Sequence, residues 1–419
     1  MTQTKRKNKN TKKHRKTRRR AIVPKDNQLL SNSVKQIIND KLYKHYRNRA
    51  INDPSLKNLS GLEIVFEHSI KKDLTQKKSY TPSINKKLVS IKSIKKHPLF
   101  TCDSLSPLEK TVSSGKLRVK VPHNGSMVCT SIYSSLAKNI FLQALKSDKI
   151  YCKNLIVPIQ YHTNCWFNTF FMCVFISDKG RKFFRFLRQA MIEGKLINGN
   201  LIQPQSLQNA LVLFNAAIEA VQNKNKHLSN SSLALNTNSI IHNIYRAIPK
   251  TYHESHYGIK DIDEYGNPLA FYTDLIDFID AKSSGIPPMK ILSGSSEVSS
   301  FLSGDSNENS DIVIVQLFNS EYTPSYAQSN HLKKRTIVKH NNYKYKLDSA
   351  VIRDNKHTHF ACAITCNGHQ MLYDGAAFTP LISKKWKNML NRNTKFKLPG
   401  SKNQWNFKKG YQILFYYRI

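Results

Sequence analysis

The sequence predicts an α+β fold, with a helical half followed by a mainly antiparallel sheet. Between residues 165 and 222, apolar side chains recur every three to four positions, which is typical of helices. From Asp311 onwards the apolar residues alternate or form short runs, separated by Asn, Gly and Pro, as in strands joined by turns. Helices followed by strands indicate an α+β arrangement rather than alternating βαβ units.

The individual elements follow from the same patterns. We expect helices from Cys165 onwards and over 126–145, 183–196, 206–222 and 274–279. We expect strands over 155–159, 311–318, 343–353, 357–365, 371–373 and 411–418. The Gly- and Ser-rich stretch 284–309 is predicted to be a loop. Thr163 and Asn164 are suitable caps for the helix that begins at Cys165.

Charge divides the chain into three parts. The net charge is +39, and residues 1–120 hold 31 Lys and Arg against 8 Asp and Glu. We expect a disordered basic tail over 1–20, a weakly ordered basic arm over 21–124 and a folded domain over 125–419. The tail is predicted to contact DNA or RNA, with an import signal and a solubilising tail as alternatives. The residues of this predicted contact are Lys5, Arg6, Lys7, Lys12, Lys13, Arg15, Lys16, Arg18, Arg19 and Arg20.

Cysteine usage and hydropathy bear on the compartment. Seven scattered cysteines and a basic N-terminus without an apolar leader favour free thiols in a reducing compartment, the cytoplasm or nucleus. The longest apolar run, residues 165–176, is too short to span a bilayer, so we expect no membrane partner.

Cys165 is the candidate nucleophile. A thiol at a helix N-terminus lies at the positive end of the helix dipole, which favours the reactive thiolate. His359 is the candidate base, and a hairpin turning at Asn367-Gly368 would bring Asp374 beside it to orient the imidazole. The alternatives are a buried structural cysteine, a structural strand histidine and a turn aspartate.

These residues and their neighbours resemble the ubiquitin-specific protease group of papain-like cysteine peptidases. The resemblance covers residues 150–419 and rests on four motifs. They are Gln160 with Asn164-Cys165-Trp166-Phe167-Asn168, Tyr345-Lys346-Leu347 with His359-Phe360, Tyr373-Asp374, and the closing Tyr411-Gln412-Ile413-Leu414-Phe415-Tyr416-Tyr417-Arg418. The usual Gly-Asn-Thr-Cys reads Thr163-Asn164-Cys165 here, and Thr358 replaces the glycine before the histidine.

The resemblance implies a papain-like fold, with a helical subdomain carrying Cys165 packed on a sheet carrying His359 and Asp374. It implies that Cys165 attacks, His359 acts as base and acid, Asp374 orients His359, and Gln160 stabilises the oxyanion, with Asn164 as the alternative. No cofactor or metal is required, and the two Cys-x-x-Cys pairs that hold zinc in many members are absent.

The implied partners are conjugates of ubiquitin or a ubiquitin-like protein, and the implied source is a large DNA virus whose virion would package the enzyme. An acidic cluster (Asp261, Asp263, Glu264, Asp274, Asp277 and Asp280) could receive a basic substrate tail or form a solvated helix face. Two alternative functions stay open: a processing protease for viral structural precursors, and a catalytically dead fold that serves as a basic nucleic-acid-binding virion protein.

Overall fold

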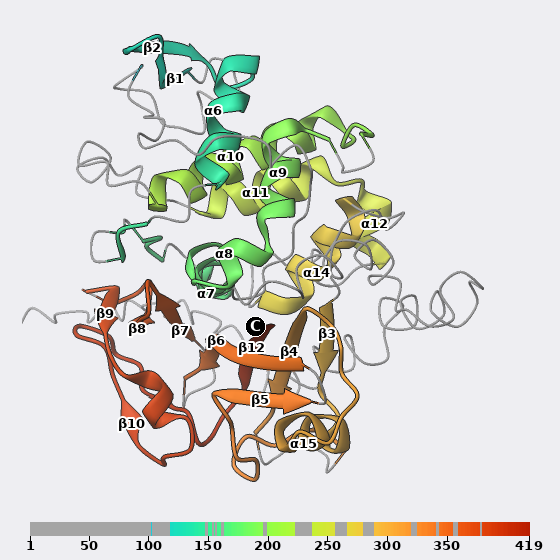
Figure 1. Cartoon of the computed structure of the whole chain (residues 1–419), viewed down its shortest axis with the longest axis vertical. Helices are drawn as coiled ribbons and strands as arrows, with labels where there is room; N and C mark the ends of the chain where they lie inside the picture. Colours follow the sequence, from blue (N-terminus) through green and yellow to red (C-terminus); the bar gives the residue numbers. More distant parts are fainter. Residues whose placement is uncertain are drawn as a thin grey trace, which may run out of the picture.

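The computed structural model places a layer of helices against one face of a sheet (Figure 1). It describes residues 102, 118–146, 150–152, 155, 157–160, 163–195, 199–222, 237–255, 266–279, 289–319, 325–340, 343–354, 359–377 and 379–419. The predicted basic tail and most of the predicted arm lie outside these residues.

The helices precede most of the strands along the chain. The helical elements are α6 (Ser135–Lys146), α7 (Cys165–Phe171), the π-helical turn Met172–Ile176, α8 (Gly180–Phe183), α9 (Arg185–Glu193), α10 (Gln205–Gln222), α11 (Thr237–Ala247), α12 (Lys250–Ser255), α14 (Pro268–Ile279), α15 (Ser295–Ser303) and the 3-10 turn Trp386–Met389. The strands are β1 (Arg118–His123), β2 (Ser126–Ser131), β3 (Met289–Leu292), β4 (Ile312–Leu317), β5 (Ile337–His340), β6 (Tyr343–Arg353), β7 (Phe360–Cys366), β8 (His369–Tyr373), β9 (Leu381–Ser383), β10 (Lys395–Phe396), β11 (Trp405–Asn406) and β12 (Gln412–Arg418).

The large sheet has the strand order β3-β4-β12-β6-β7-β8-β9, and β5 pairs with β6 beside this path. Neighbouring strands are antiparallel except β3 and β4, which are parallel. The prediction of an antiparallel sheet is therefore wrong at the β3 edge, where the Gly- and Ser-rich stretch contributes a strand instead of a loop.

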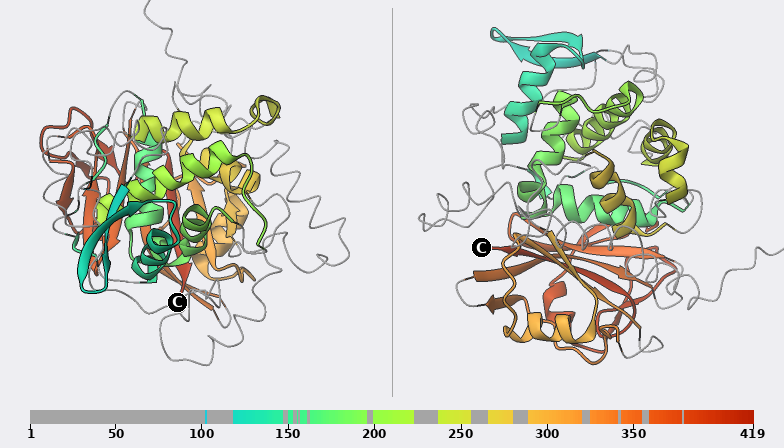
Figure 2. Two further views of the ribbon diagram at one scale, coloured as in Figure 1. Left: turned by 90° about the horizontal axis from the view of Figure 1, so that it is seen from above. Right: turned by 90° about the vertical axis from the view of Figure 1, so that its right-hand side faces the viewer.

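The sheet separates two hydrophobic clusters, and β12 contributes to both. Phe415 belongs to the cluster on the helical side, whereas Leu414 belongs to the cluster on the other side. This alternation follows from the two-residue period of a strand. Phe170 of α7 packs on Phe415 with ring centroids 5.3 Å apart, so the helix that begins at Cys165 lies directly on the sheet. Figure 2 shows the helices on one side and α15 on the other.

Most of the predicted strands and helices are confirmed, with three corrections of type. The predicted helix 126–145 is β2 followed by α6, because Asn124 and Gly125 have φ of 47° and 80° and turn β1 back onto β2. The predicted boundary between residues 124 and 125 falls in this turn. The described residues of 155–159 form no strand. In 284–309, α15 forms because Val298, Phe301 and Leu302 recur at helical spacing and are buried in the second cluster.

Two disulfide bonds correct the expectation of seven free thiols. Cys102 bonds to Cys129, and Cys152 bonds to Cys366 across 214 residues of sequence. The fold brings the Cα atoms of each pair to 5.8 Å, a proximity that cysteine spacing alone does not reveal. Cys165, Cys173 and Cys362 are free and buried. Within the described part of the chain, no helix is both long and apolar enough to cross a membrane.

Candidate active site

The hairpin of β7 and β8 brings the candidate histidine and aspartate together. Its two-residue turn consists of Asn367 and Gly368, with φ of 46° and 76°, the positive values that a tight hairpin turn requires. Cys362 pairs with Tyr373 at the far end of the ladder. His359 immediately precedes β7 and Asp374 immediately follows β8, so both lie at the open end of the hairpin.

His359 and Asp374 form a short hydrogen bond inside the protein. The distance from Nε2 of His359 to Oδ1 of Asp374 is 2.6 Å, and both side chains are buried. The same carboxylate accepts a hydrogen bond from the backbone N–H of Ala376 at 2.9 Å, and Ser401 also acts to lower its pKa. Burial favours the neutral acid, but the bonds from His359 and these groups outweigh it and lower the pKa of Asp374.

Cys165 also acts on the imidazole. Its side chain lies close enough to His359 to raise the pKa of the histidine, and since Nε2 is bonded to Asp374, Nδ1 is the nitrogen left for the sulfur. Burial disfavours the imidazolium, but the hydrogen bonds and charges of Asp374 and Cys165 outweigh this effect and raise the pKa of His359 to about 10. The structure thus brings three of the four predicted catalytic residues into one chain of contacts.

Two residues that the sequence patterns did not single out hold the histidine in place. The His359 backbone N–H donates to Oδ1 of Asp354 at 2.9 Å, and the Asp354 N–H donates to the His359 carbonyl at 2.8 Å. The Trp405 ring lies 6.0 Å from the imidazole, measured between centroids. The five-residue spacing of Asp354 and His359 is a weak signal of such a closed loop, and nothing in the sequence pairs Trp405 with His359.

Gln160 lies on a segment that is bound along β8. The Tyr373 hydroxyl donates to the Pro158 carbonyl at 2.7 Å, and the Gln160 backbone N–H donates to the Gly375 carbonyl at 2.9 Å. A Cβ atom at Gly375 would lie 2.7 Å from the Tyr373 hydroxyl and 3.1 Å from the Gln160 nitrogen, so only glycine fits this approach. Gln160 is therefore held beside the residue that follows Asp374.

Asn164 does not cap α7, contrary to the sequence-based prediction. Asn164 occupies the N-cap position of this helix, but its side chain makes no capping hydrogen bond there. Asn164 instead donates from Nδ2 to the Thr237 hydroxyl of α11 at 2.9 Å, and this hydroxyl hydrogen-bonds Asn168. The two asparagines on either side of the Cys165-Trp166-Phe167 motif thus join α7 to α11, and the Asn164 amide points into this buried contact.

The other two free thiols, Cys173 and Cys362, interact with each other. Cys362 hydrogen-bonds Cys173, and burial raises the pKa of Cys362 well above its usual value. Cys362 and Cys366 belong to the helical-side cluster, whereas Ala361 belongs to the opposite cluster, in keeping with the two-residue period of a strand. Among the described residues, no group of three or more His, Cys, Asp and Glu side chains could hold a metal ion.

The acidic cluster does not offer a solvated helix face where it is described. Asp274 and Asp277 lie on α14 and are 3% and 9% exposed, because this side of the helix packs within the helical layer. The other four acids of the cluster lie outside the described residues.

Comparisons with known proteins add little to this geometry. No protein-family model matches the chain, and no curated protein matches it in sequence. Among solved structures, the chain is similar to the SAGA DUB module of Ubp8, Sgf11, Sus1 and Sgf73 bound to monoubiquitin. The TM-score is 0.38 and the identity 9%, over 74% of this chain and 83% of that chain. A similarity at this level does not establish a shared fold.

Proposed function

We propose that this chain is a cysteine peptidase that removes ubiquitin or a ubiquitin-like protein from its conjugates. The observation that carries the proposal is the position of His359, which hydrogen-bonds the Asp374 carboxylate and lies close enough to Cys165 for the cysteine to raise its pKa. A thiol, an imidazole and an orienting carboxylate in this order are the parts needed for covalent acyl transfer.

In the acylation step, the Cys165 sulfur attacks the carbonyl carbon of the scissile bond as a thiolate, with its proton held on His359, whose raised pKa favours the imidazolium. The bond between sulfur and carbon forms, and the carbonyl becomes a tetrahedral oxyanion. When this intermediate collapses, the imidazolium gives its proton to the leaving nitrogen, the C–N bond breaks, and the amine departs. Asp374 keeps the imidazole in the orientation that both proton transfers need.

In the deacylation step, His359 takes a proton from water, which attacks the thioester. The tetrahedral intermediate then collapses, the C–S bond breaks, and the product leaves as a carboxylic acid while the proton returns to Cys165. Gln160 is the proposed side-chain donor to the oxyanion, together with the Cys165 backbone N–H. The bonds that hold its segment along β8 support this role, since an oxyanion donor must be positioned before the reaction.

The choice of substrate rests on the resemblance of the Cys165, His359 and closing-strand motifs to ubiquitin-specific proteases. The closing strand itself supports the fold rather than recognition, because every residue of β12 is buried between β4 and β6. The geometry around Cys165 is equally suited to a protease that processes other precursors.

A ubiquitin probe with a C-terminal electrophile tests the proposal. We expect the probe to label the wild-type chain and the Cys173→Ala variant, and not to label Cys165→Ala. Cys173 is the matched control because it is also free and buried but does not contact the histidine.

Two results would count against the proposal in different ways. If a small peptide electrophile labels Cys165 while the ubiquitin probe does not, the proposed peptidase activity is retained but ubiquitin is not the substrate. This result would favour a processing protease. If neither reagent labels Cys165 in folded protein, the proposal of peptidase activity is wrong. This result would favour the alternative of a catalytically dead fold.

A further inference from the structure

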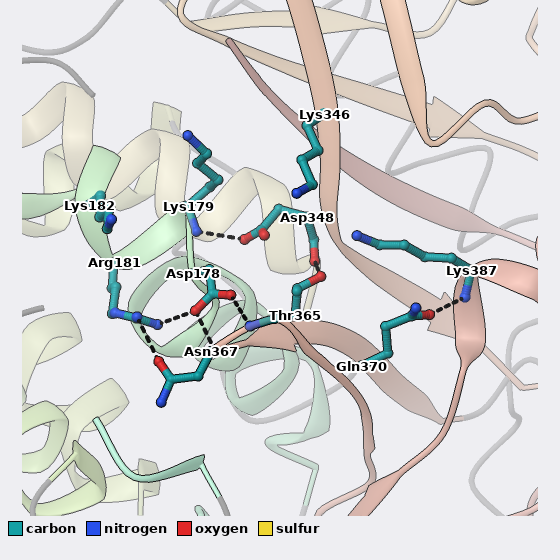
Figure 3. A pocket seen from close by; sticks show the side chains of 11 residues that line it. Asp178, Lys179, Arg181, Lys182, Lys346, Asp348, Thr365, Asn367, Gln370 and Lys387 are labelled. Carbon is teal, nitrogen blue, oxygen red and sulfur yellow. Dashed lines mark hydrogen bonds and ion pairs between the residues drawn. The ribbon is translucent and has the colours of Figure 1, made fainter. Parts of the chain in front are cut away.

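A cavity lies at the opposite end of the β7–β8 hairpin from the candidate triad. It has a volume of about 590 Å³ and includes the hairpin turn in its wall. At the open end of the hairpin, Asp374 lies about 20 Å of strand from this turn and His359 about 26 Å. The lining residues are Asp178, Lys179, Arg181, Lys182, Lys346, Asp348, Thr365, Asn367, Gly368, Gln370 and Lys387 (Figure 3).

The wall of this cavity carries five cationic side chains and two carboxylates. Both carboxylates already accept hydrogen bonds from backbone N–H groups. Asp178 forms an ion pair with Arg181 at 2.8 Å and accepts hydrogen bonds from the backbone N–H groups of Asn367 and Gly368 at 2.7 and 2.9 Å. It therefore stabilises the hairpin turn, and its charge is already compensated.

Asp348 is the second carboxylate, and it is almost completely buried. It accepts a hydrogen bond from the Lys179 backbone N–H at 2.8 Å. Burial favours its neutral form and raises its pKa. The negative charge of this one buried carboxylate, whose pKa is raised, does not neutralise the positive charge of the lysines around it.

Lys346 and Lys387 approach Asp348 from different elements. Lys346 comes from β6 and Lys387 from the 3-10 turn, and Figure 3 shows both ammonium ends turned toward Asp348. Burial lowers the pKa of Lys387; Asp348 opposes this shift and Lys346 adds to it. Burial also lowers the pKa of Lys179 to about 8, again against the attraction of Asp348. The cost of these charges is therefore mainly that of burial, and a bound anion would offset it by favouring the charged ammonium groups.

The frame around these lysines is well bonded. Arg181 donates to the Ile176 carbonyl at 3.2 Å, and the Thr365 hydroxyl donates to the Asp348 carbonyl at 2.8 Å. The Lys387 backbone N–H donates to the Gln370 side chain at 2.9 Å. Lys179 and Arg181 are themselves more than nine-tenths buried. The cavity is thus a built feature of the junction between the helical layer and the sheet.

We propose that this cavity binds a small di- or triphosphate group, held by the ammonium groups of Lys346 and Lys387. Lysine ammonium groups bind phosphate oxygens as strongly hydrated point charges, and the cavity has the size typical of small-ligand sites. The proposal is independent of peptidase activity, because it concerns the other end of the hairpin.

Calorimetric titration of the full chain with pyrophosphate and tripolyphosphate, at constant ionic strength, tests this site. The matched variants are Lys346→Gln/Lys387→Gln in the cavity and Lys344→Gln/Lys385→Gln outside it. Each double variant removes one positive charge from β6 and one from the segment around the 3-10 turn. Lys344 and Lys385 serve as the control pair because they are exposed and do not line the cavity.

We expect one saturable site on the wild-type chain and on the outside variant, and binding at least about tenfold weaker on the cavity variant. Equal binding by all three proteins would overturn the proposal, because it would assign the phosphate to general attraction by the basic chain. Absence of saturable binding by the wild type would overturn it as well. Thermal melting of each variant shows whether it is folded.

Discussion

The two ends of the β7–β8 hairpin use charge in opposite ways. At the open end, the His359 imidazole hydrogen-bonds one carboxylate, and one thiol acts on it as well. At the turn end, five cations line a cavity whose two carboxylates are bound to the surrounding protein. The first arrangement compensates charge internally and suits proton transfer, whereas the second leaves an excess positive charge and suits an external anion.

The largest expected effect comes from removing the carboxylate at the open end. Asp374→Ala should lower kcat/KM by about 100- to 10,000-fold, because the buried imidazole loses the acceptor that orients it. Asp374→Asn keeps an acceptor oxygen and should lose less. Steady-state hydrolysis of a fluorogenic ubiquitin conjugate measures both.

Asp348→Asn is the matched change at the turn end and should leave kcat/KM unaltered, since Asp348 contacts neither Cys165 nor His359 in the hydrogen bonds described above. Equal losses in the Asp348 and Asp374 variants would mean that the two ends do not differ as argued.

The oxyanion donor comes next in magnitude. Gln160→Ala should lower kcat by about 100- to 1000-fold with little change in KM, because the lost bond exists mainly in the transition state. Asn164→Ala should instead lower stability, since its amide joins α7 to α11. If Asn164→Ala gave the kcat loss and Gln160→Ala did not, the two assignments would be reversed.

The charge of His359 predicts a pH dependence. Its pKa rises from about 6.5 in the unfolded chain to about 10 in the folded protein. Its contribution to stability is therefore complete below about pH 6.5 and is lost as the pH rises through 10. We expect kcat/KM to decline about tenfold per unit above pH 10 as the imidazolium deprotonates. Asp374→Asn should move this decline to lower pH, and an unchanged alkaline limb would argue against the contact.

A smaller effect is expected from the bond that holds the Gln160 segment. Tyr373→Phe should lower the free energy of unfolding by about 1–3 kcal/mol, because the buried Pro158 carbonyl loses its donor. Tyr417→Phe is the control: Tyr417 is equally buried, and its hydroxyl has no hydrogen-bond partner among the described residues. Urea denaturation measures the free energy of unfolding of both variants. Equal losses would show that the hydrogen bond of Tyr373 adds no stability of its own.

The sheet half of the fold could be predicted from the sequence better than the helical half. The strand at 343–353 has the predicted bounds. A long apolar alternation that ends at polar residues defines where a strand begins and ends. The helix predicted over 126–145 is wrong only in its first half, where the turn Asn124-Gly125, with positive φ at both residues, pairs β2 with β1; α6 confirms the second half. The β3 strand is only four residues long, and its pairing with β4 is a tertiary event that local patterns do not encode.

The same division applies to the candidate sites. The meeting of His359 and Asp374 could be predicted because the Asn367-Gly368 turn sets the register between them. Asp354 and Trp405 could not, since their contacts with His359 depend on how the loop and β11 pack. The basic cavity draws lysines from the helical layer, β6 and the 3-10 turn, and these are adjacent only in three dimensions.

The central claim is that His359 activates Cys165, and alkylation by iodoacetamide tests it most directly. Peptide mass spectrometry can follow modification of Cys165, Cys173 and Cys362 separately as the pH is varied. We predict that Cys165 alone reacts rapidly at pH 6, and that His359→Ala abolishes this reaction because the thiolate loses its imidazolium partner. Alkylation of Cys165 only above pH 8.5, at the same rate in His359→Ala and wild type, would contradict the claim.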